Sequence, residues 1–139
     1  MKFDFPLDIV IIDDEPDISE MIRMALSFID EFNPICFESS TEGFEYIKKN
    51  RIRFLMTDLM MPDLSGVDLI KQCRLLPWNI DVLALTGAEQ PDLVYECYNL
   101  GVLGIFTKPV EIYQLTDLLK VQAERYRCWH DVSEELGIG

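Results

Sequence analysis

Short apolar runs alternate with longer amphipathic stretches along the chain, and this alternation constrains the fold more than any other feature of the sequence. The apolar runs are 9–12, 35–37, 54–57, 82–85 and 105–107. Runs of this length, rich in Ile, Val, Leu and Phe, are typical of strands buried on both faces. The stretches between them carry apolar residues at helical spacing. The order predicts a (βα)₅ chain that forms a three-layer α/β/α sandwich around a parallel sheet.

Three of the helices can be outlined in more detail. Apolar residues after Pro16 keep helical spacing as far as Ile29, which predicts a first helix of that length. Ser40 or Thr41 is the expected N-cap of the second helix, which closes at 48–50. A stripe at alternating three- and four-residue spacing predicts a long last helix. This stripe comprises Ile112, Leu115, Leu119, Gln122, Tyr126, Trp129, Ser133 and Leu136.

The charge balance narrows the class of partner. The 139 residues include 12 Lys and Arg against 25 Asp and Glu, which gives a formal net charge of −13. Such a charge repels phosphate backbones and anionic lipids, so we expect neither nucleic acid nor a membrane as a partner. Because no stretch resembles a signal peptide or a membrane span, we expect a cytoplasmic protein.

The cysteines and the histidine offer little chemistry. Cys36, Cys73, Cys97 and Cys128 are widely separated and form no C-x-x-C pair, and His130 is the only histidine. A zinc site or a disulfide framework is therefore not expected. We interpret the cysteines as small apolar residues of the core.

Polar residues follow four of the five predicted strands. Asp13 and Asp14 follow the first strand, Asp58 the third, Thr86 the fourth and Lys108 the fifth. Each of these residues alone would be read as a helix cap or a solvated side chain. Because parallel strands end at the same edge of a sheet, the set together predicts a ligand site there.

The residue types at this edge suggest phosphoryl chemistry. Clustered carboxylates repel one another unless a hard cation joins them, and oxygen ligands suit Mg²⁺. An ammonium and a hydroxyl group beside the metal would hold the oxygens of a phosphoryl group. Asp58 is then the candidate nucleophile, which would form an aspartyl phosphate.

These motifs resemble the receiver domain of bacterial response regulators over about residues 7 to 125. The resemblance lies in Ile12-Asp13-Asp14-Glu15, in the segment 57–66, in Leu85-Thr86-Gly87 and in Thr107-Lys108-Pro109. It implies a flavodoxin-like fold with strand order 2-1-3-4-5. It also implies a two-component signalling protein that takes its phosphoryl group from a histidine kinase or a phosphotransfer protein and acts on an unknown output partner.

The resemblance also implies a role for each matched residue. Asp58 would be the phosphoacceptor, and Asp14 would bind Mg²⁺ directly with Asp13 assisting. The backbone carbonyl of Met60 looks like a further ligand of the ion. Lys108 would pair with the phosphoryl oxygens, and Thr86 would hydrogen-bond one of them and move when it arrives.

The chain departs from the family pattern at three positions. Ile105 stands where the family usually has Tyr or Phe, so switching through an aromatic ring is not expected. Phe106 cannot substitute, because successive strand side chains point to opposite faces. Met60 and Ala88 cannot orient a water molecule, which predicts a long-lived phosphorylated state.

The end of the chain extends past the usual receiver boundary. We expect a receiver domain over residues 1–125 and a helical extension or linker over 126–139. The extension either packs back on the domain, with Trp129 covering apolar surface, or forms a homodimer, or leads to an output domain.

Three functions remain open from the residues alone. The first is a phosphorylation-controlled switch, which catalyses no reaction other than its own phosphorylation and dephosphorylation. The second is a small Mg²⁺-dependent phosphatase. Met60 argues against it, because such enzymes have a second acidic residue at this position. The third is a pseudo-receiver that binds partners without being phosphorylated, an alternative that the Ile105 departure keeps open.

Overall fold

Strands and helices alternate through the computed structural model, which describes residues 3–87 and 90–138. The elements are β1 (Leu7–Ile12), α1 (Pro16–Leu26), β2 (Phe32–Phe37), α2 (Ser40–Asn50), β3 (Phe54–Asp58), α3 (Gly66–Cys73), β4 (Asp81–Thr86), α4 (Pro91–Asn99), β5 (Gly104–Thr107) and α5 (Ile112–Leu136). All strand pairs are parallel, in the order β2-β1-β3-β4-β5. The predicted flavodoxin-like (βα)₅ fold is confirmed.

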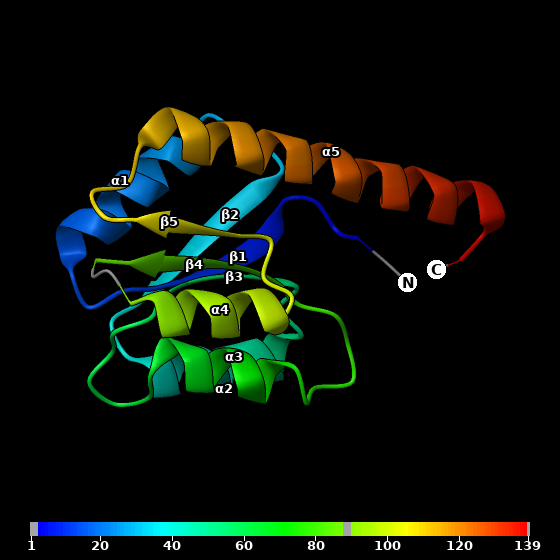
Figure 1. Ribbon diagram of the computed structural model, residues 1–139. Helices are drawn as coiled ribbons and strands as arrows, with labels where there is room; N and C mark the ends of the chain where they lie inside the picture. The colour runs from blue at the N-terminus through cyan, green and yellow to red at the C-terminus, as the bar shows by residue number, and fades with distance from the viewer. Residues whose placement is uncertain (1–2, 88–89, 139) are drawn as a thin grey trace.

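Two helical layers cover the sheet. Figure 1 shows α1 and α5 on one face, with α2, α3 and α4 on the other. Successive β1 side chains enter the two layers in turn: Ile9 and Ile11 join the cluster with α1 and α5, whereas Val10 and Ile12 join the cluster with α2 and α3. This alternation explains why the strands are apolar along their whole length.

The segment between α1 and β2 differs from the prediction. Helix α1 ends at Leu26 rather than Ile29, and Ser27 Oγ then donates to the Met24 carbonyl. Ile29 remains buried in the core between the sheet, α1 and α5, and its N–H donates to the Leu26 carbonyl at 3.0 Å in a tight turn. A buried residue therefore follows at helical spacing although the helix has already ended. Strand β2 begins at Phe32 rather than at residue 35. Asn33 and Pro34 interrupt the apolar run, which hid the start of the strand in the sequence.

The N-cap of α2 lies one residue before the predicted candidates. Ser39, not Ser40 or Thr41, has the extended backbone of a cap, and its hydroxyl accepts the Glu42 N–H at 3.2 Å. Three successive hydroxyl residues can all cap a helix, so composition does not distinguish between them. The choice depends on where the chain leaves β2.

Helix α5 runs for 25 residues without interruption, and Figure 1 shows it extending beyond the sheet. The predicted stripe is buried at Leu115, Leu119, Gln122, Tyr126 and Ser133. Trp129 and Leu136, which also belong to this stripe, are 56% and 68% exposed. The N-terminal segment runs beside this last part of the helix.

Two aromatic residues of that segment contact α5. The ring centroids of Phe3 and Tyr126 lie 5.7 Å apart, and those of Phe5 and His130 lie 5.4 Å apart. The Arg127 guanidinium lies over the Phe5 ring at 3.8 Å from its centroid. Tyr126 also packs against Phe32 of β2 and Phe54 of β3, with ring centroids 6.2 Å and 6.0 Å apart, so the first turn of the extension is buried against the sheet.

All four cysteines are free. Cys73 and Cys97 are buried and Cys36 is half-buried, as expected of core residues. Cys128 is exposed on α5, so its interpretation as a core residue is wrong. Among residues 3–87 and 90–138, no helix has the length and apolar character needed to span a bilayer.

Candidate functional site

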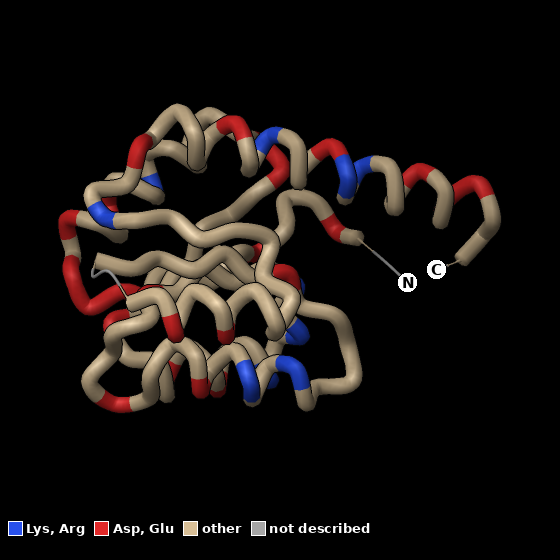
Figure 2. The backbone as a smooth tube through the Cα atoms, in the orientation of Figure 1, with Lys and Arg blue, Asp and Glu red and all other residues tan. Residues whose placement is uncertain are grey.

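The carboxyl ends of the central strands place the predicted residues side by side. Asp58 ends β3 and pairs in register with Leu85 of β4, while Thr86 pairs with Thr107 of β5. Asp13 follows β1, whose Ile12 pairs with Thr57. Figure 2 shows acidic residues along the loop between β1 and α1 at this same edge. The strand order therefore brings together groups that are far apart in the sequence.

Lys108 is the cation around which these groups gather. Its Nζ lies 2.9 Å from Asp13 Oδ2, 2.9 Å from Asp58 Oδ2 and 3.0 Å from Glu15 Oε1. Its side chain is 10% exposed, so the contacts are largely shielded from water. One buried ammonium group thus meets three carboxylates, which leaves a surplus of negative charge.

The acidic group itself has the form of a hard-cation site. Carboxylate oxygens of Asp13, Asp14, Glu15 and Asp58 lie within 4.8 Å of one another. Asp13 and Asp58 are buried, whereas Asp14 and Glu15 are exposed. Glu15 was not predicted as a site residue, although its position beside the acidic pair was a visible signal.

Burial and ion pairing shift two pKa values in the site. Burial raises the pKa of Asp13 above its ordinary value, although contacts with Lys108 and the Glu15 N–H oppose the shift. Burial alone would lower the pKa of Lys108, but its bonds to Asp13, Asp58 and Glu15 outweigh this effect and raise it. Lys108 is therefore firmly cationic at neutral pH.

The loop after β3 orients the Asp58 carboxylate. The Met60 N–H donates to Asp58 Oδ1 at 3.0 Å, while Lys108 contacts the other oxygen. Gly66, at the start of α3, approaches so closely that a Cβ there would lie 2.3 Å from the Asp58 carbonyl oxygen. Only glycine permits this approach, so Gly66 allows α3 to begin directly against the Asp58 backbone.

Thr86 and Ile105 occupy different surroundings. Thr86 is buried at the site, and its carbonyl accepts the Lys108 N–H at 2.7 Å. Ile105 is half-buried and packs in the cluster that includes Cys97 of α4. Phe106 packs with the α1 and α5 cluster, which confirms that it faces the opposite side from Ile105. The Lys108–Pro109 peptide bond is cis.

The side chains of His130 and Met60 do not join the site. His130 lies in the extension of α5 against Phe5. Ala88 lies outside the described residues. The Met60 side chain is 54% exposed, so only its backbone takes part in the contacts around Asp58. The site thus consists of carboxylates, one ammonium group, one hydroxyl group and backbone atoms.

Known proteins share this fold and sequence pattern. The chain is 23% identical over 112 residues to sporulation initiation phosphotransferase F of Bacillus subtilis (strain 168), covering 81% of this chain and 90% of that protein. It is 29% identical over 122 residues to the regulatory protein VanRc of Enterococcus gallinarum, covering 88% of this chain but only 52% of that regulator. The chain therefore spans about half the length of VanRc.

A solved structure and a family profile agree with these relatives. A response regulator receiver domain protein from Clostridium thermocellum has a TM-score of 0.77 and 29% identity, with 88% of this chain and 98% of that chain covered. The profile of the response regulator receiver domain matches residues 9–120, which include the whole acidic group and Lys108. The chain belongs to the response regulator receiver domain family of two-component systems.

Proposed function

We propose that this receiver domain is a phosphorylation-controlled switch and that Asp58 accepts the phosphoryl group. One observation carries the proposal: Lys108 Nζ lies 2.9 Å from both the Asp13 and Asp58 carboxylates, where the strands end. A nucleophilic oxygen, a shielded cation and additional carboxylates are the groups that phosphoryl transfer to a carboxylate requires. A cytoplasmic histidine kinase or a histidine phosphotransfer protein would be the donor.

The transfer step follows from these groups. An Asp58 oxygen attacks the phosphorus of a phosphohistidine on the donor, and the new O–P bond forms as the N–P bond breaks. The electron pair of the broken bond stays on the imidazole nitrogen, which takes up a proton from water. Lys108 offsets the charge of the phosphoryl oxygens. The product is an aspartyl phosphate on Asp58.

The residues of the acidic group fit Mg²⁺. They offer oxygen ligands only, and the exposure of Asp14 leaves room for the water molecules that this ion retains. We assign direct binding to Asp14 and Asp58, an assisting role to Asp13, and a further ligand to the Met60 carbonyl. When bound, the ion neutralises charge on the transferred phosphoryl group.

Thr86 and Ile105 would pass the signal on. The Thr86 hydroxyl is expected to hydrogen-bond a phosphoryl oxygen, and its movement would change the packing of Ile105 against α4. Because an isoleucine is smaller than an aromatic ring, we expect a smaller change of surface shape than in family members with Tyr or Phe. Amide chemical shifts around Ile105 that stay unchanged on phosphorylation would contradict this route.

Two surfaces would bind other proteins. The acidic surface around α1 suits a basic face on the phosphoryl donor. The surface of α4, β5 and α5 would contact the output protein, and it carries Tyr95, Tyr98 and Tyr113, which are 70%, 79% and 76% exposed. Exposed tyrosines are frequent anchors in protein interfaces.

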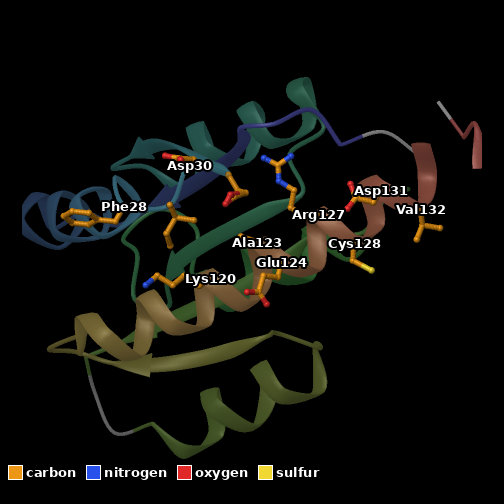
Figure 3. Close-up of a pocket in the computed structure, with 11 residues that line it drawn as sticks. Phe28, Asp30, Lys120, Ala123, Glu124, Arg127, Cys128, Asp131 and Val132 are labelled. Carbon is orange, nitrogen blue, oxygen red and sulfur yellow. The ribbon is translucent and has the colours of Figure 1, made fainter. Parts of the chain in front are cut away.

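We further propose residues 1–125 as the receiver domain and 126–139 as an extension that joins two copies of the chain. Most of the predicted stripe is buried within one chain, so a second copy would contact a different face. Val121 and Val132 lie on that exposed face and are 50% and 42% exposed. Figure 3 shows the hollow beside it, lined by Phe28 and Cys128.

Light scattering coupled to gel filtration, with Val132→Asp as the disrupting variant, tests the dimer. A native protein that stays monomeric at high concentration would eliminate it.

The phosphorylation itself is tested by intact mass spectrometry after incubation with Mg²⁺ and acetyl phosphate. We expect one phosphoryl group on the native protein, and none on Asp58→Asn or in the presence of a chelator. No adduct from either acetyl phosphate or a phosphorylated histidine phosphotransfer protein would favour a pseudo-receiver. Rapid consumption of many donor molecules per protein would favour a phosphatase.

A further inference from the structure

The loop between β3 and α3 is anchored to a helix that contributes no residue to the site. Asp63, five residues after Asp58, accepts hydrogen bonds from the first residues of α2 and from its N-cap. Its Oδ2 accepts from Ser39 Oγ at 2.8 Å, Thr41 N at 3.0 Å and Thr41 Oγ1 at 2.9 Å. Its Oδ1 accepts from Ser40 N at 3.4 Å.

Asp63 is a surface residue, yet its carboxylate is well satisfied. The Thr41 N–H and the hydroxyl groups of Ser39 and Thr41 hold the pKa of Asp63 well below its ordinary value. The carboxylate also lies at the N-terminus of α2, where the helix dipole favours a negative charge. The contact is therefore favourable at neutral pH without any cation.

Helix capping alone does not account for this contact. Ser39 already caps α2 with its own hydroxyl, which accepts the Glu42 N–H at 3.2 Å. Ser65 likewise caps α3 by accepting the Asp68 N–H at 3.2 Å. Both helices thus have local caps, and the contacts of Asp63 instead connect the middle of the β3–α3 loop to α2.

The position of this loop matters because it carries two groups of the site. The Met60 N–H orients Asp58 Oδ1 at 3.0 Å, and the Met60 carbonyl is proposed above as a further ligand for Mg²⁺. Two backbone hydrogen bonds hold the ends of the loop. The Leu59 N–H donates to the Leu85 carbonyl at 2.9 Å, and the Gly66 N–H donates to the Leu59 carbonyl at 3.0 Å. Asp63 supplies the anchor between these two ends.

We propose that Asp63 is a positioning residue for phosphoryl transfer, which holds the β3–α3 loop so that the Met60 backbone meets Asp58 and Mg²⁺ in the right place. The proposal rests on the function proposed above. Residues that orient metal ligands without touching the metal affect both metal affinity and reaction rate. Asp63 touches neither the metal nor the phosphoryl group, so it is not a catalytic residue.

The test compares variants of the full chain in two measurements. The first is the dissociation constant of Mg²⁺ by calorimetry, without any phosphodonor. The second is the initial rate of phosphoryl uptake from acetyl phosphate by intact mass. We expect Asp63→Ala to weaken Mg²⁺ binding and slow uptake by about 10-fold each. Asp63→Asn keeps one acceptor oxygen and should recover part of both losses.

Two further variants separate positioning from stability. Ile80→Val trims a buried side chain at the opposite edge of the sheet, so it lowers stability without touching the loop. We expect it to leave Mg²⁺ affinity and uptake rate unchanged. Thr41→Val removes one hydroxyl donor and keeps the backbone bond, so it tests the contact even if Asp63→Ala fails to fold. We expect its losses to lie between those of native protein and Asp63→Ala.

The outcomes distinguish this proposal from the one on which it rests. If Asp63→Ala lowers the melting temperature but leaves Mg²⁺ affinity and uptake within about two-fold of native, Asp63 only stabilises the fold and the proposal is wrong. If the native protein itself takes up no phosphoryl group, the proposed function fails. The Mg²⁺ affinities of the variants then decide the role of Asp63 alone.

Discussion

The two edges of the sheet each carry an aspartate network that is at least partly buried, and only one has the character of a reactive site. At the carboxyl edge, Lys108 contacts Asp13, Glu15 and Asp58 at 2.9 to 3.0 Å. At the amino edge, Asp81 Oδ2 accepts from Tyr126 Oη and, at 3.0 Å, from Gln122 Nε2. Both networks join distant parts of the chain.

The difference lies in charge and access. At the amino edge, neutral donors satisfy one carboxylate, and the result ties α5 to the start of β4. At the carboxyl edge, three carboxylates meet one ammonium group, and the exposed Asp14 adds a fourth. The surplus negative charge there favours a metal ion and, with it, a phosphoryl group. A buried polar network therefore indicates a site when its charges are left unbalanced beside solvent.

The largest expected effect comes from removing the cation of the carboxyl edge. Lys108→Met should lower the initial rate of phosphoryl uptake by about 100-fold, because the charge that offsets the phosphoryl oxygens is lost. Intact mass against time measures the rate. Lys120→Met, on the surface of α5, is the matched control and should keep the native rate. Native-like uptake by Lys108→Met would show that the ammonium group at the carboxyl edge does not contribute to phosphoryl transfer.

A methyl group at Gly66 should disturb the carboxyl edge through its backbone. Gly66→Ala places Cβ 2.3 Å from the Asp58 carbonyl oxygen, so α3 and the loop must shift apart. We expect the free energy of unfolding to fall by about 2 to 4 kcal/mol and phosphoryl uptake to slow. Urea titration and intact mass measure the two effects. Gly87→Ala is the control for stability, since the nearest described atom to its Cβ would be Lys108 Cδ at 3.8 Å, an ordinary contact.

At the amino edge, the same kind of perturbation should change stability alone. Tyr126→Phe removes the hydroxyl that donates to Asp81 and should lower the free energy of unfolding by about 1 to 2 kcal/mol. Phosphoryl uptake should keep the native rate. Tyr98→Phe, at a position that is 79% exposed, should be nearly neutral in the same urea titration. Slower uptake in Tyr126→Phe would mean that the amino edge also contributes to the site.

The smallest expected effect is an alkaline loss of stability that Tyr126 causes in part. Burial and the nearby Asp81 charge raise the pKa of Tyr126 above its ordinary value. Below about pH 10 the phenol is protonated in both states, whereas above it the unfolded chain loses the proton first. The free energy of unfolding should therefore fall above about pH 10, and less steeply in Tyr126→Phe. Urea titrations at neutral and alkaline pH would test this; equal slopes would contradict it.

Much of the fold could be predicted because strand and helix periodicities are local properties of the sequence. All five apolar runs lie in strands, and the long α5 is present as predicted. The predictions fail where contacts with other parts of the chain determine the ends of a helix. Ile29 keeps helical spacing after α1 has ended, and Ser39 caps α2 although Ser40 and Thr41 are equally good N-caps by composition. Trp129 is 56% exposed although it belongs to the apolar stripe of α5.

Part of the candidate site could be predicted because the residues that follow each strand can be read from the sequence. The strand ends identified Asp13, Asp58, Thr86 and Lys108, since parallel strands share an edge. The contact between Glu15 and Lys108, at 3.0 Å, depends on side-chain reach across a loop, which no spacing encodes. The roles of the metal and phosphoryl residues stay predictions for the experiments above.

By itself, the sequence determined the order of strands and helices and the types of residue that follow each strand, because both are written in local periodicity and composition. The tertiary structure decided which of these residues meet. Only the folded chain brings one ammonium group within 3.0 Å of three carboxylates and ties Asp63 to α2, because both depend on distances between segments far apart in the chain.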